Sequence, residues 1–460
     1  MKMETENPSD DTASSDLGVR IDGENTQDPK SWRQQLVNAE NDRGRAFAAS
    51  EWIRACGDIE PVEGGQLRAY NDDGTWSEDG TQALREKLRS QLQEEYGKQL
   101  RNKTKEQLLA GGVIRRDAFG MPHRKVAVEN GLLDLQTGEL RPIRPGDRVL
   151  WKLPVEYVPD AECPKFKRVL KQWLPNEEVR DKLQEYIGYA LDFNNTDYQV
   201  MLMLVGPTRT GKSTFLETIG TLFGEENTTN MSIQYLANDK WGVAELEQTP
   251  VNIRHDLDST DIRQEGVVKE LASGEPMKAE RKRQDPYTVH PKTKHLFSAN
   301  QVPDCAHTDD AFYNRWLMVE FDQQVPKDSR DQKLNEKLTT PEELSGILNW
   351  ALEGYQRLQD QGQFTAARSP DETRALWQKN GGSIDRFIYE HIETVEDAAI
   401  PKEMMYAAYK EFAASYGAAP ESKSKLTMKL KTLDGVDTSQ RRFENGRKRV
   451  YAGVRLTDWK

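Results

Sequence analysis

Residues 206–213 have the spacing of a phosphate-binding loop. They read Gly-Pro-Thr-Arg-Thr-Gly-Lys-Ser and fit the pattern G-x-x-x-x-G-K-[ST]. The glycines of such a loop let backbone N–H groups turn toward phosphate oxygens, and the dipole of the following helix adds to the attraction. Lys212 is expected to reach the β- and γ-phosphates, and Ser213 to coordinate Mg²⁺. The predicted ligands are therefore ATP and Mg²⁺. The predicted binding residues are Gly206, Pro207, Thr208, Arg209, Thr210, Gly211, Lys212, Ser213 and Thr214.

Such a loop needs a second acid, at the end of a neighbouring parallel strand, to hold the metal and polarise the attacking water. Residues 251–258, Val-Asn-Ile-Arg-His-Asp-Leu-Asp, supply a short strand that leads into two carboxylates. We assign Asp256 to the metal and the water, with Asp258 or His255 as its helper. A solvated acidic turn is the alternative interpretation of this run.

Two further polar residues follow the loop at places where catalysis could use them. Asn300 comes just after a strand predicted at 295–298, where its amide could orient the attacking water and sense the γ-phosphate. Arg315 lies in the run 309–316 and is placed to act across a subunit boundary. Each taken alone reads as an ordinary turn or surface residue. Their order along the chain makes them candidate catalytic residues together with Lys212 and Asp256.

Basic residues are concentrated locally in an acidic chain, in which 64 Lys and Arg face 76 Asp and Glu for a net charge of −12. Because such a chain cannot bind nucleic acid with its whole surface, DNA contacts must be gathered at a few places. Residues 421–460 contain eleven basic and five acidic residues. A second cluster precedes a turn near residue 285, and a solvated basic hairpin is its alternative interpretation. The cluster consists of Lys278, Arg281, Lys282 and Arg283.

Apolar patterning predicts the elements that position the loop. Residues 201–205 form a continuous apolar run, typical of a strand buried on both faces of a parallel sheet. A helix predicted at 214–223 follows the loop and ends at Gly224. Further strands are predicted at 251–253, 295–298 and 316–321, with helical segments between them. This alternation indicates an α/β fold, and we place the P-loop ATPase domain at 198–370.

The flanking sequence predicts three more parts. Residues 1–45 are acidic and polar, which indicates a disordered leader. Residues 46–197 are interpreted as one α+β module. Its predicted elements are hairpins at 67–76 and 125–140 and helices at 83–96, 164–173 and 177–191. A helix at 341–359 and a linker at 361–370 end the ATPase domain.

The last part, 381–460, is predicted to be a winged helix. It shows helices at 384–392, 401–416 and 423–433, followed by strands at 436–438 and 450–456. The residues expected to contact duplex DNA are Lys425, Lys429, Arg447 and Arg449. A protein-docking module is the alternative, because such folds also bind proteins.

Composition excludes several other classes of protein. Three widely spaced cysteines fit a reducing cytosol rather than a disulfide framework, and six scattered histidines offer no zinc spacing. The sequence has no apolar run of the roughly 18 residues that a membrane span needs, and its N-terminus does not resemble a signal peptide. We therefore expect a cytosolic protein of the host cell without a membrane partner.

The order of these motifs resembles the superfamily 3 helicases, within the phage and plasmid primase-helicase family that also includes pox-virus-type NTPases. The segments that carry the resemblance are 206–213, the acids after Ile253, 269–282, 298–303 and 312–321, with flanking matches at 128–135, 186–191 and 343–352. The resemblance implies an AAA+-like core and a ring, usually a hexamer, with ATP between subunits and single-stranded DNA in the channel. It also implies that Arg315 reaches a neighbour's γ-phosphate, and that residues 281–283 lie at or near the tip of a channel hairpin.

Three positions depart from the pattern of that family. Thr210 stands where the family often has Asn, Asp256 where Glu is usual, and Asn314 precedes Arg315 where two Arg are frequent. The identity of the catalytic base therefore stays open. No paired-Asp motif of primase type is present, so priming is not predicted, and a separate primase or replication protein is a candidate partner.

The sequence thus predicts an ATP-dependent replicative DNA helicase of a virus, plasmid or integrated element. One alternative is an ATP-switched origin-binding initiator that acts as a scaffold without unwinding DNA. The other is a small-molecule P-loop kinase, which the basic C-terminal part and the lack of a lid-like Arg cluster disfavour.

Overall fold

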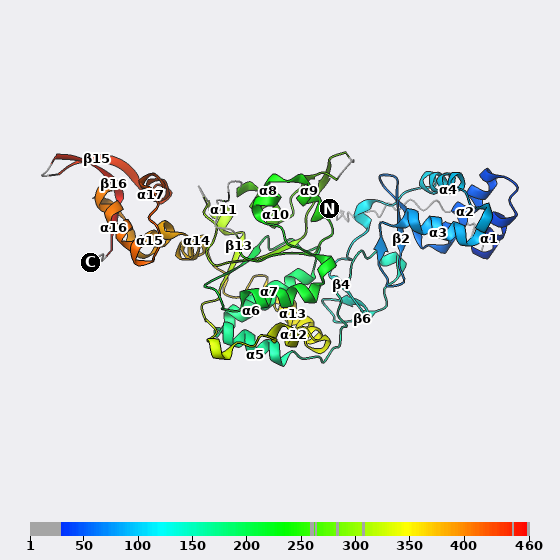
Figure 1. Cartoon of the computed structure of the whole chain (residues 1–460), viewed down its shortest axis with the longest axis horizontal. Coiled ribbons are helices and arrows are strands. Elements are labelled where there is room, and N and C mark those ends of the chain that lie inside the picture. The colour runs from blue at the N-terminus through cyan, green and yellow to red at the C-terminus, as the bar shows by residue number, and fades with distance from the viewer. Residues whose placement is uncertain are drawn as a thin grey trace, which may run out of the picture. The chain divides into compact units, whose positions relative to one another are not determined.

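The computed structural model describes residues 29–257, 262, 265–281, 285–305, 309–443 and 446–457. The chain divides into two compact units, which are described separately (Figure 1). The first contains Met1–Ala69 and Glu78–Ile114, and the second contains Tyr70–Ser77 and Arg115–Lys460. No helix among the described residues has the length and apolar character needed to cross a membrane.

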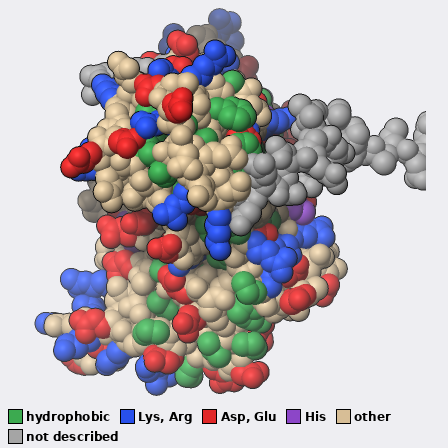
Figure 2. All heavy atoms as spheres, turned by 90° about the vertical axis from the view of Figure 1, so that its right-hand side faces the viewer, with side chains coloured by type: hydrophobic (Ala, Val, Ile, Leu, Met, Phe, Trp, Pro, Cys, Tyr) green, Lys and Arg blue, Asp and Glu red, His purple; other side chains and the backbone are tan. Residues whose placement is uncertain are grey.

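The first unit is a small helical domain with an antiparallel strand pair. Its helices are α1 (Pro29–Asn38), α2 (Asp42–Cys56), α3 (Gly80–Leu92) and α4 (Lys98–Ala110), and its strands are β1 (Ile59–Val62) and β2 (Gln66–Tyr70). Leu84, Leu88 and Leu92 recur every four residues on α3 and are buried, as their spacing predicts. Acidic and basic side chains are interspersed on the molecular face drawn in Figure 2.

Helix α1 corrects the prediction that residues 1–45 are a disordered leader. Trp32 and Leu36, four residues apart, are buried in the core of the first unit, and the Trp32 ring packs edge-on against Phe47 at 5.9 Å. The acidic composition of residues 1–30 masked this short apolar face, because composition averages over a window while a helix needs only one buried stripe. Residues 1–28 lie outside the described part of the chain.

The second unit begins with a small antiparallel sheet. Its strands are β4 (Lys125–Val128), β5 (Gly131–Asp134) and β6 (Leu140–Arg141), and β3 (Trp76–Ser77) also belongs to this unit. The predicted hairpin is confirmed, since Val128 pairs with Gly131 across the two-residue loop Glu129-Asn130. Helices α5 (Pro164–Trp173) and α6 (Glu177–Leu191) have the predicted bounds. Their buried residues join the core of the following sheet, so this division differs from the predicted module 46–197.

A five-stranded parallel sheet forms the centre of the second unit and confirms the predicted α/β class. The strands are β7 (Met201–Val205), β8 (Thr228–Thr229), β9 (Val251–Arg254), β12 (Lys294–Ala299) and β13 (Trp316–Glu320), in the order β13-β7-β12-β9-β8. Leu202 and Leu204 join the core on one face, and Met201, Met203 and Val205 join the core on the other. Both faces are covered, which explains why β7 is apolar throughout.

Helices cover the two faces of the sheet (Figure 1). On one side lie α6, α7 (Lys212–Phe223), α12 (Leu334–Leu338) and α13 (Pro341–Gln361). On the other side lie α8 (Ile233–Asn238), α9 (Lys240–Glu245), α10 (Glu265–Ser273) and α11 (Asp310–Tyr313). A separate antiparallel pair, β10 (Met277–Ala279) and β11 (Tyr287–Val289), forms the predicted basic hairpin.

The C-terminal part alternates helices and strands. Its buried residues from Ile384 onward form a core of their own, whereas Leu376 and Trp377 join a core of the parallel sheet. Its helices are α14 (Pro370–Lys379), α15 (Ser383–His391), α16 (Lys402–Ser415) and α17 (Lys423–Leu430), and its strands are β14 (Ile392–Pro401), β15 (Asp437–Phe443) and β16 (Gly446–Leu456). The sheet order is β14-β16-β15, all antiparallel. Strand β14 was not predicted, and its pairing with β16 is interrupted between Thr394 and Ala399. We call residues 383–457 the C-terminal module.

Burial of His295 on β12 makes the stability of the fold sensitive to acid. The ring is 1% exposed, and its Nδ1 lies 3.1 Å from Nδ2 of Asn252 on the adjacent strand β9. Burial lowers the pKa of His295 to about 3, and the neighbouring Lys294 ammonium adds to the shift. The folded chain therefore keeps a neutral ring at pH values where the unfolded chain, with an ordinary pKa of about 6.5, binds a proton.

We expect His295→Asn to reduce the acid sensitivity of the free energy of unfolding. As the pH falls from 6.5 to 4.5, wild type should lose about 2–3 kcal/mol more than the variant, since each pKa unit corresponds to about 1.4 kcal/mol. The Asn carbonyl can still accept a hydrogen bond from Asn252 but does not titrate. Denaturant unfolding at both pH values measures the difference, and parallel losses in the two proteins would contradict the assignment.

Candidate functional site

The loop between β7 and α7 has a backbone that requires its two glycines. Gly206 has a φ of +146°, and a Cβ there would lie 2.1 Å from the Phe321 carbonyl oxygen. Gly211 has a φ of +102°, and a Cβ there would lie 2.4 Å from the Trp173 ring. The hydroxyl of Thr210, 1% exposed, donates to the Pro207 carbonyl at 3.0 Å and closes the loop from inside. The motif therefore corresponds to a defined, tightly packed turn.

Lys212, the first residue of α7, places its ammonium beneath this loop. Its Nζ donates to the Gly206 and Pro207 carbonyl oxygens at 2.6 and 2.8 Å and to Oδ1 of Asn300 at 3.3 Å. Burial lowers the pKa of Lys212, and the Asp256 carboxylate opposes that shift. The hydrogen-bond partners in the described part of the chain are all neutral oxygens. The loop thus holds a cation able to attract an anionic ligand.

Parallel pairing brings the other predicted groups to the same edge of the sheet. Ala299 pairs with Val205, so Asn300 emerges beside the start of the loop, whose Gly206 N–H donates to the Ala299 carbonyl at 3.3 Å. Asp256 follows β9 with an exposed side chain and a left-handed φ of +46°. Its backbone N–H donates to the Ser298 hydroxyl of β12 at 3.2 Å. Lys212, Asp256 and Asn300 therefore gather at one edge.

Arg315 lies at the opposite ends of the strands, where β7 and β13 begin. It comes just before β13, and its carbonyl accepts a hydrogen bond from Met201 N, at the start of β7, at 2.8 Å. The five residues of β7 separate this point from the loop, which corresponds to about 16 Å at 3.3 Å per residue. Nε of Arg315 is buried without a hydrogen-bond partner among the described residues. Within one chain, Arg315 is therefore remote from the loop.

A cavity of about 570 Å³ opens beside the loop, a feature that was not predictable from the sequence. This volume falls in the range of small-molecule sites. The apolar part of its wall comes from α5 and from the segment after β13, and three arginines add positive charge. Its lining includes Val169, Trp173, Val325, Arg168, Arg209 and Arg330. Trp173 packs against the Gly211 turn, so the cavity is continuous with the phosphate-binding loop.

The oxygen ligands near the loop fit Mg²⁺ only if the oxygens of a bound phosphate complete its coordination. Among the described residues, no three His, Cys, Asp or Glu side chains group closely enough to hold a metal ion. The Ser213 hydroxyl and the Asp256 carboxylate are both exposed near the loop. Mg²⁺ commonly takes one or two protein ligands, with phosphate oxygens and waters completing its shell. His255 is partly exposed, and the alternative helper Asp258 lies outside the described residues.

The β10–β11 hairpin presents its predicted cations unequally. Lys278 is exposed and donates to the Thr288 hydroxyl at 3.1 Å. Arg281 is half-buried and pairs with Glu247 at 3.0 Å, a carboxylate that also accepts from the Tyr287 hydroxyl at 2.9 Å. Arg281 thus lies in the connection that follows the last paired residue of β10, and Glu247 holds its side chain there. Lys282 and Arg283 lie outside the described residues.

The β15–β16 hairpin exposes a dense group of cations. Arg447 and Arg449 are exposed, as the sequence predicts. The strand register places Arg442 opposite Arg447 and Arg441 opposite Lys448, so like charges face each other. Cross-strand pairs of like charge are destabilising. A polyanionic partner would relieve this repulsion by compensating the positive charges. Arg441, Arg442 and Lys448 were not among the predicted DNA contacts, because their clustering depends on this register.

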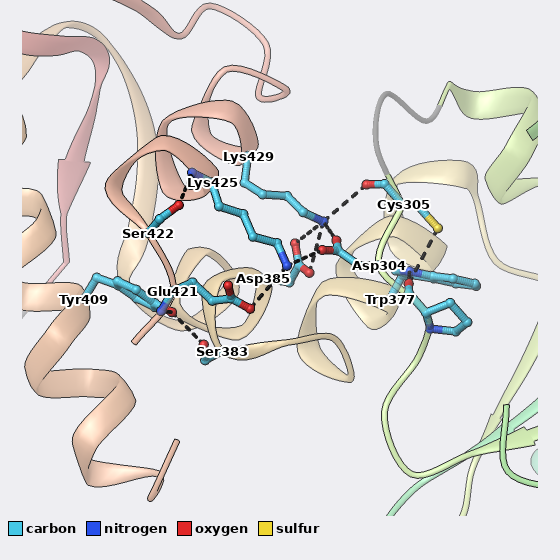
Figure 3. A network of polar contacts seen from close by, with 11 residues as sticks. Asp304, Cys305, Trp377, Ser383, Asp385, Tyr409, Glu421, Ser422, Lys425 and Lys429 are labelled. Carbon is cyan, nitrogen blue, oxygen red and sulfur yellow. Dashed lines mark hydrogen bonds and ion pairs between the residues drawn. The ribbon is translucent and has the colours of Figure 1, made fainter. Parts of the chain in front are cut away.

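Lys425 and Lys429 differ from the prediction that they contact duplex DNA. Lys429 is only 8% exposed and forms ion pairs with Asp304 and Asp385 (Figure 3). Lys425 Nζ lies 2.9 Å from Asp304 and 3.2 Å from Glu421. Burial alone would raise the pKa of Asp304, but the two ammonium groups lower it below its ordinary value. Lys429 in this arrangement is not available to a DNA phosphate.

The packing at Gly211 gives a direct test of the loop. We expect Gly211→Ala to lower the free energy of unfolding by about 1–3 kcal/mol, because the methyl group meets the Trp173 ring and the left-handed backbone disfavours alanine. Gly220→Ala on α7 is the matched control, since its Cβ would lie 3.7 Å from the nearest side-chain atom. This control should be neutral or stabilising. Denaturant unfolding measures both variants, and equal stabilities would show that the loop accommodates a side chain.

Comparisons with known proteins match two segments of the chain. Residues 49–175 match the family described as "D5 N terminal like", and residues 204–315 match a "Family of unknown function (DUF5906)". The chain is similar to a solved structure of the NrS-1 C terminal region in its A form without ligand, at 10% identity with a TM-score of 0.48, covering 88% of this chain and 98% of that one. A second apo structure of that region gives 10% identity and a TM-score of 0.47, covering 89% and 99%. All four predicted catalytic residues lie within the segment 204–315.

Proposed function

We propose that this protein is an ATP-dependent DNA helicase that serves the replication of a virus, plasmid or integrated element. The observation that carries the proposal is the gathering of Lys212, Asp256 and Asn300 around a closed phosphate-binding loop at one edge of a parallel sheet. The match to the "D5 N terminal like" family points to the phage and viral primase-helicases and supports an enzyme of DNA replication. Strand displacement that requires ATP is the decisive assay.

The strand order supports an AAA+-like P-loop core. Counted along the chain within the sheet, the order β13-β7-β12-β9-β8 reads 5-1-4-3-2, which is the arrangement expected of that core. The strand that leads into the loop, β7, therefore lies between two parallel neighbours. A ligand at this edge lies at the carboxyl ends of the strands, where parallel α/β sheets bind their ligands.

In the proposed reaction, water attacks the γ-phosphate of ATP in line with the leaving group. The backbone amides of 206–211 and the Lys212 ammonium stabilise the developing charge on phosphate oxygens. Asp256 and Asn300 orient the attacking water, and their placement just after two adjacent strands allows both to face one point. Mg²⁺, held by Ser213 and Asp256 together with ATP, would neutralise charge on the phosphates. The cavity beside Trp173 can accept the rest of the nucleotide.

The remoteness of Arg315 supports a ring. An arginine about 16 Å along the sheet from the loop cannot stabilise charge on a nucleotide bound by its own chain. It can serve a neighbouring subunit if the copies pack so that the strand starts of one sheet face the strand ends of the next. Heterologous contacts of that kind generate closed rings. A hexameric ring around single-stranded DNA is the assembly that we propose.

The C-terminal module supports contact with DNA. Its order of helix, strand, two helices and a two-stranded hairpin is that of a winged helix, and the hairpin carries the dense cations described above. We propose that Arg447 and Arg449 contact the phosphates of duplex DNA, and that Lys278 and its neighbours contact single-stranded DNA in the channel. Binding through such contacts should weaken steeply with salt, because each releases counterions from the DNA.

Lys212→Ala should abolish ATP hydrolysis, because no other described cation donates into the loop. Lys167→Ala is the matched control, since Lys167 is exposed on α5. Phosphate release measured with and without single-stranded DNA tests both variants. Undiminished hydrolysis by Lys212→Ala would place the reaction elsewhere. DNA binding that depends on ATP, without strand displacement by the wild type, would favour the initiator scaffold instead.

Arg315→Ala should leave ATP binding intact and block turnover, because the arginine acts on the neighbour's nucleotide. Mixed with wild type at equal concentration, the variant should reduce hydrolysis well below half of the wild-type rate. Arg89→Ala, exposed on α3 in the first unit, is the control and should not affect the mixture. Steady-state hydrolysis across mixing ratios is the measurement. A linear dependence on the fraction of wild type would contradict action between subunits.

A further inference from the structure

The segment that follows Asn300, residues 301–305, is held by α14 near its C-terminal end. The Val302 N–H donates to the Asn380 carbonyl at 2.9 Å, and Nε1 of Trp377 donates to the Pro303 carbonyl at 3.1 Å. Val302 is also fully buried. This segment therefore cannot shift without breaking contacts with the chain that leads into the C-terminal module.

Two lysines of α17 reach the same segment from within the C-terminal module (Figure 3). Lys429 Nζ lies between Asp304 and Asp385, 2.9 Å from the latter carboxylate, and donates to the Cys305 carbonyl at 3.3 Å. Lys425, one helical turn earlier, lies 2.9 Å from the other oxygen of Asp304. The Asp304 carboxylate thus receives two ammonium groups from a single helix.

Because these ion pairs are buried, they restrict how the groups around them can be arranged. Lys429 and Asp385 are each 8% exposed, and the Asp304 side chain is 17% exposed. Removing one partner of a buried ion pair leaves an uncompensated charge, so the arrangement is hard to replace by a shifted one. Buried pairs of this kind contribute little net stability but can select a single arrangement of the groups around them. The network therefore selects one docked position of residues 301–305.

This position bears directly on the loop. Asp304 is four residues from Asn300, and Oδ1 of Asn300 lies 3.3 Å from Lys212 Nζ. Between them the chain is fixed by Val302 and Pro303, as described above. A displacement of Asp304 is thus transmitted through a short, hydrogen-bonded stretch of backbone to the amide that faces the loop.

We propose that Lys429 and Asp304 are positioning residues for ATP hydrolysis, through which the docked C-terminal module holds Asn300 beside Lys212. The inference rests on the proposed ATPase and goes beyond it by making turnover depend on docking of the DNA-binding module. Lys429 thereby has a role inside the protein, distinct from phosphate contact. Nucleotide binding, which depends on the loop itself, does not require the network.

Hydrolysis by the full-length chain, measured over a range of ATP concentrations, tests this role. Lys429→Gln and Asp304→Asn should each lower kcat by about tenfold and change KM by less than about twofold, a size typical of coupling through packed contacts. Lys429→Arg should restore most of the activity, because it keeps the charge. Lys431→Gln is the matched control, since Lys431 is exposed just after α17 and its ion pair in the described part of the chain is with exposed Asp437 at 3.5 Å. The double variant Lys429→Gln/Asp304→Asn should lose less than the product of the single losses.

Hydrogen exchange separates failure of this inference from failure of the proposed function. The Val302 amide should exchange faster in Lys429→Gln than in wild type or Lys431→Gln, whether or not the protein hydrolyses ATP. An inactive wild type with this exchange pattern would overturn the ATPase and leave the docking contact intact. Unchanged exchange would overturn the positioning role. A change in KM as large as the change in kcat would overturn it as well. If Lys429→Gln does not fold, Lys425→Gln at the half-exposed edge of the network applies the same tests.

Discussion

Parallel pairing of β7 with its neighbours is the constraint on which the rest of the second unit depends. In a parallel sheet all strands end at the same edge, so the residues after β7, β9 and β12 must meet there. This alone brings Asp256 and Asn300 to the loop although they are 44 residues apart in the sequence. The same geometry sends Arg315, which precedes a strand, to the opposite edge. One architectural fact thus separates the groups gathered around the loop from Arg315, for which we propose a role in a neighbouring subunit.

Buried charge recurs around this sheet, and its cost differs with the partners available. Lys212 and His295 have pKa values lowered mainly by burial, so each is disfavoured in its charged form where it lies. Lys429 is buried as well, but two carboxylates raise its pKa instead. Lys212 donates to neutral oxygens and the His295 ring stays neutral, while the charge of Lys429 is compensated by two carboxylates of the same chain. Lys212 is the one among these whose surroundings leave charge for an anionic ligand.

The basic C-terminal module shows that charge composition does not assign roles to individual residues. Lys429 and Arg447 belong to the same run of cations in the sequence. In the structure the former joins the segment after β12 to the C-terminal module, and the latter is exposed on a hairpin where another arginine stands opposite. One basic stretch therefore contains both cations that pair within the protein and exposed cations, for which we propose contact with a polyanion. Only exposure and pairing distinguish them.

The sequence by itself determined the local features of this protein. The apolar run of β7, the helices α5 and α6 and the glycines of the loop were predictable, because each depends on residues close together in the chain. Tertiary structure decided what depends on distant partners: the burial of Trp32 in the supposed leader, the strand β14 and the ion pairs of Lys429. The sequence alone does not predict whether a short apolar stripe is buried, an interrupted strand is paired or a lysine forms an ion pair. These outcomes depend on the residues that the fold places next to each of them.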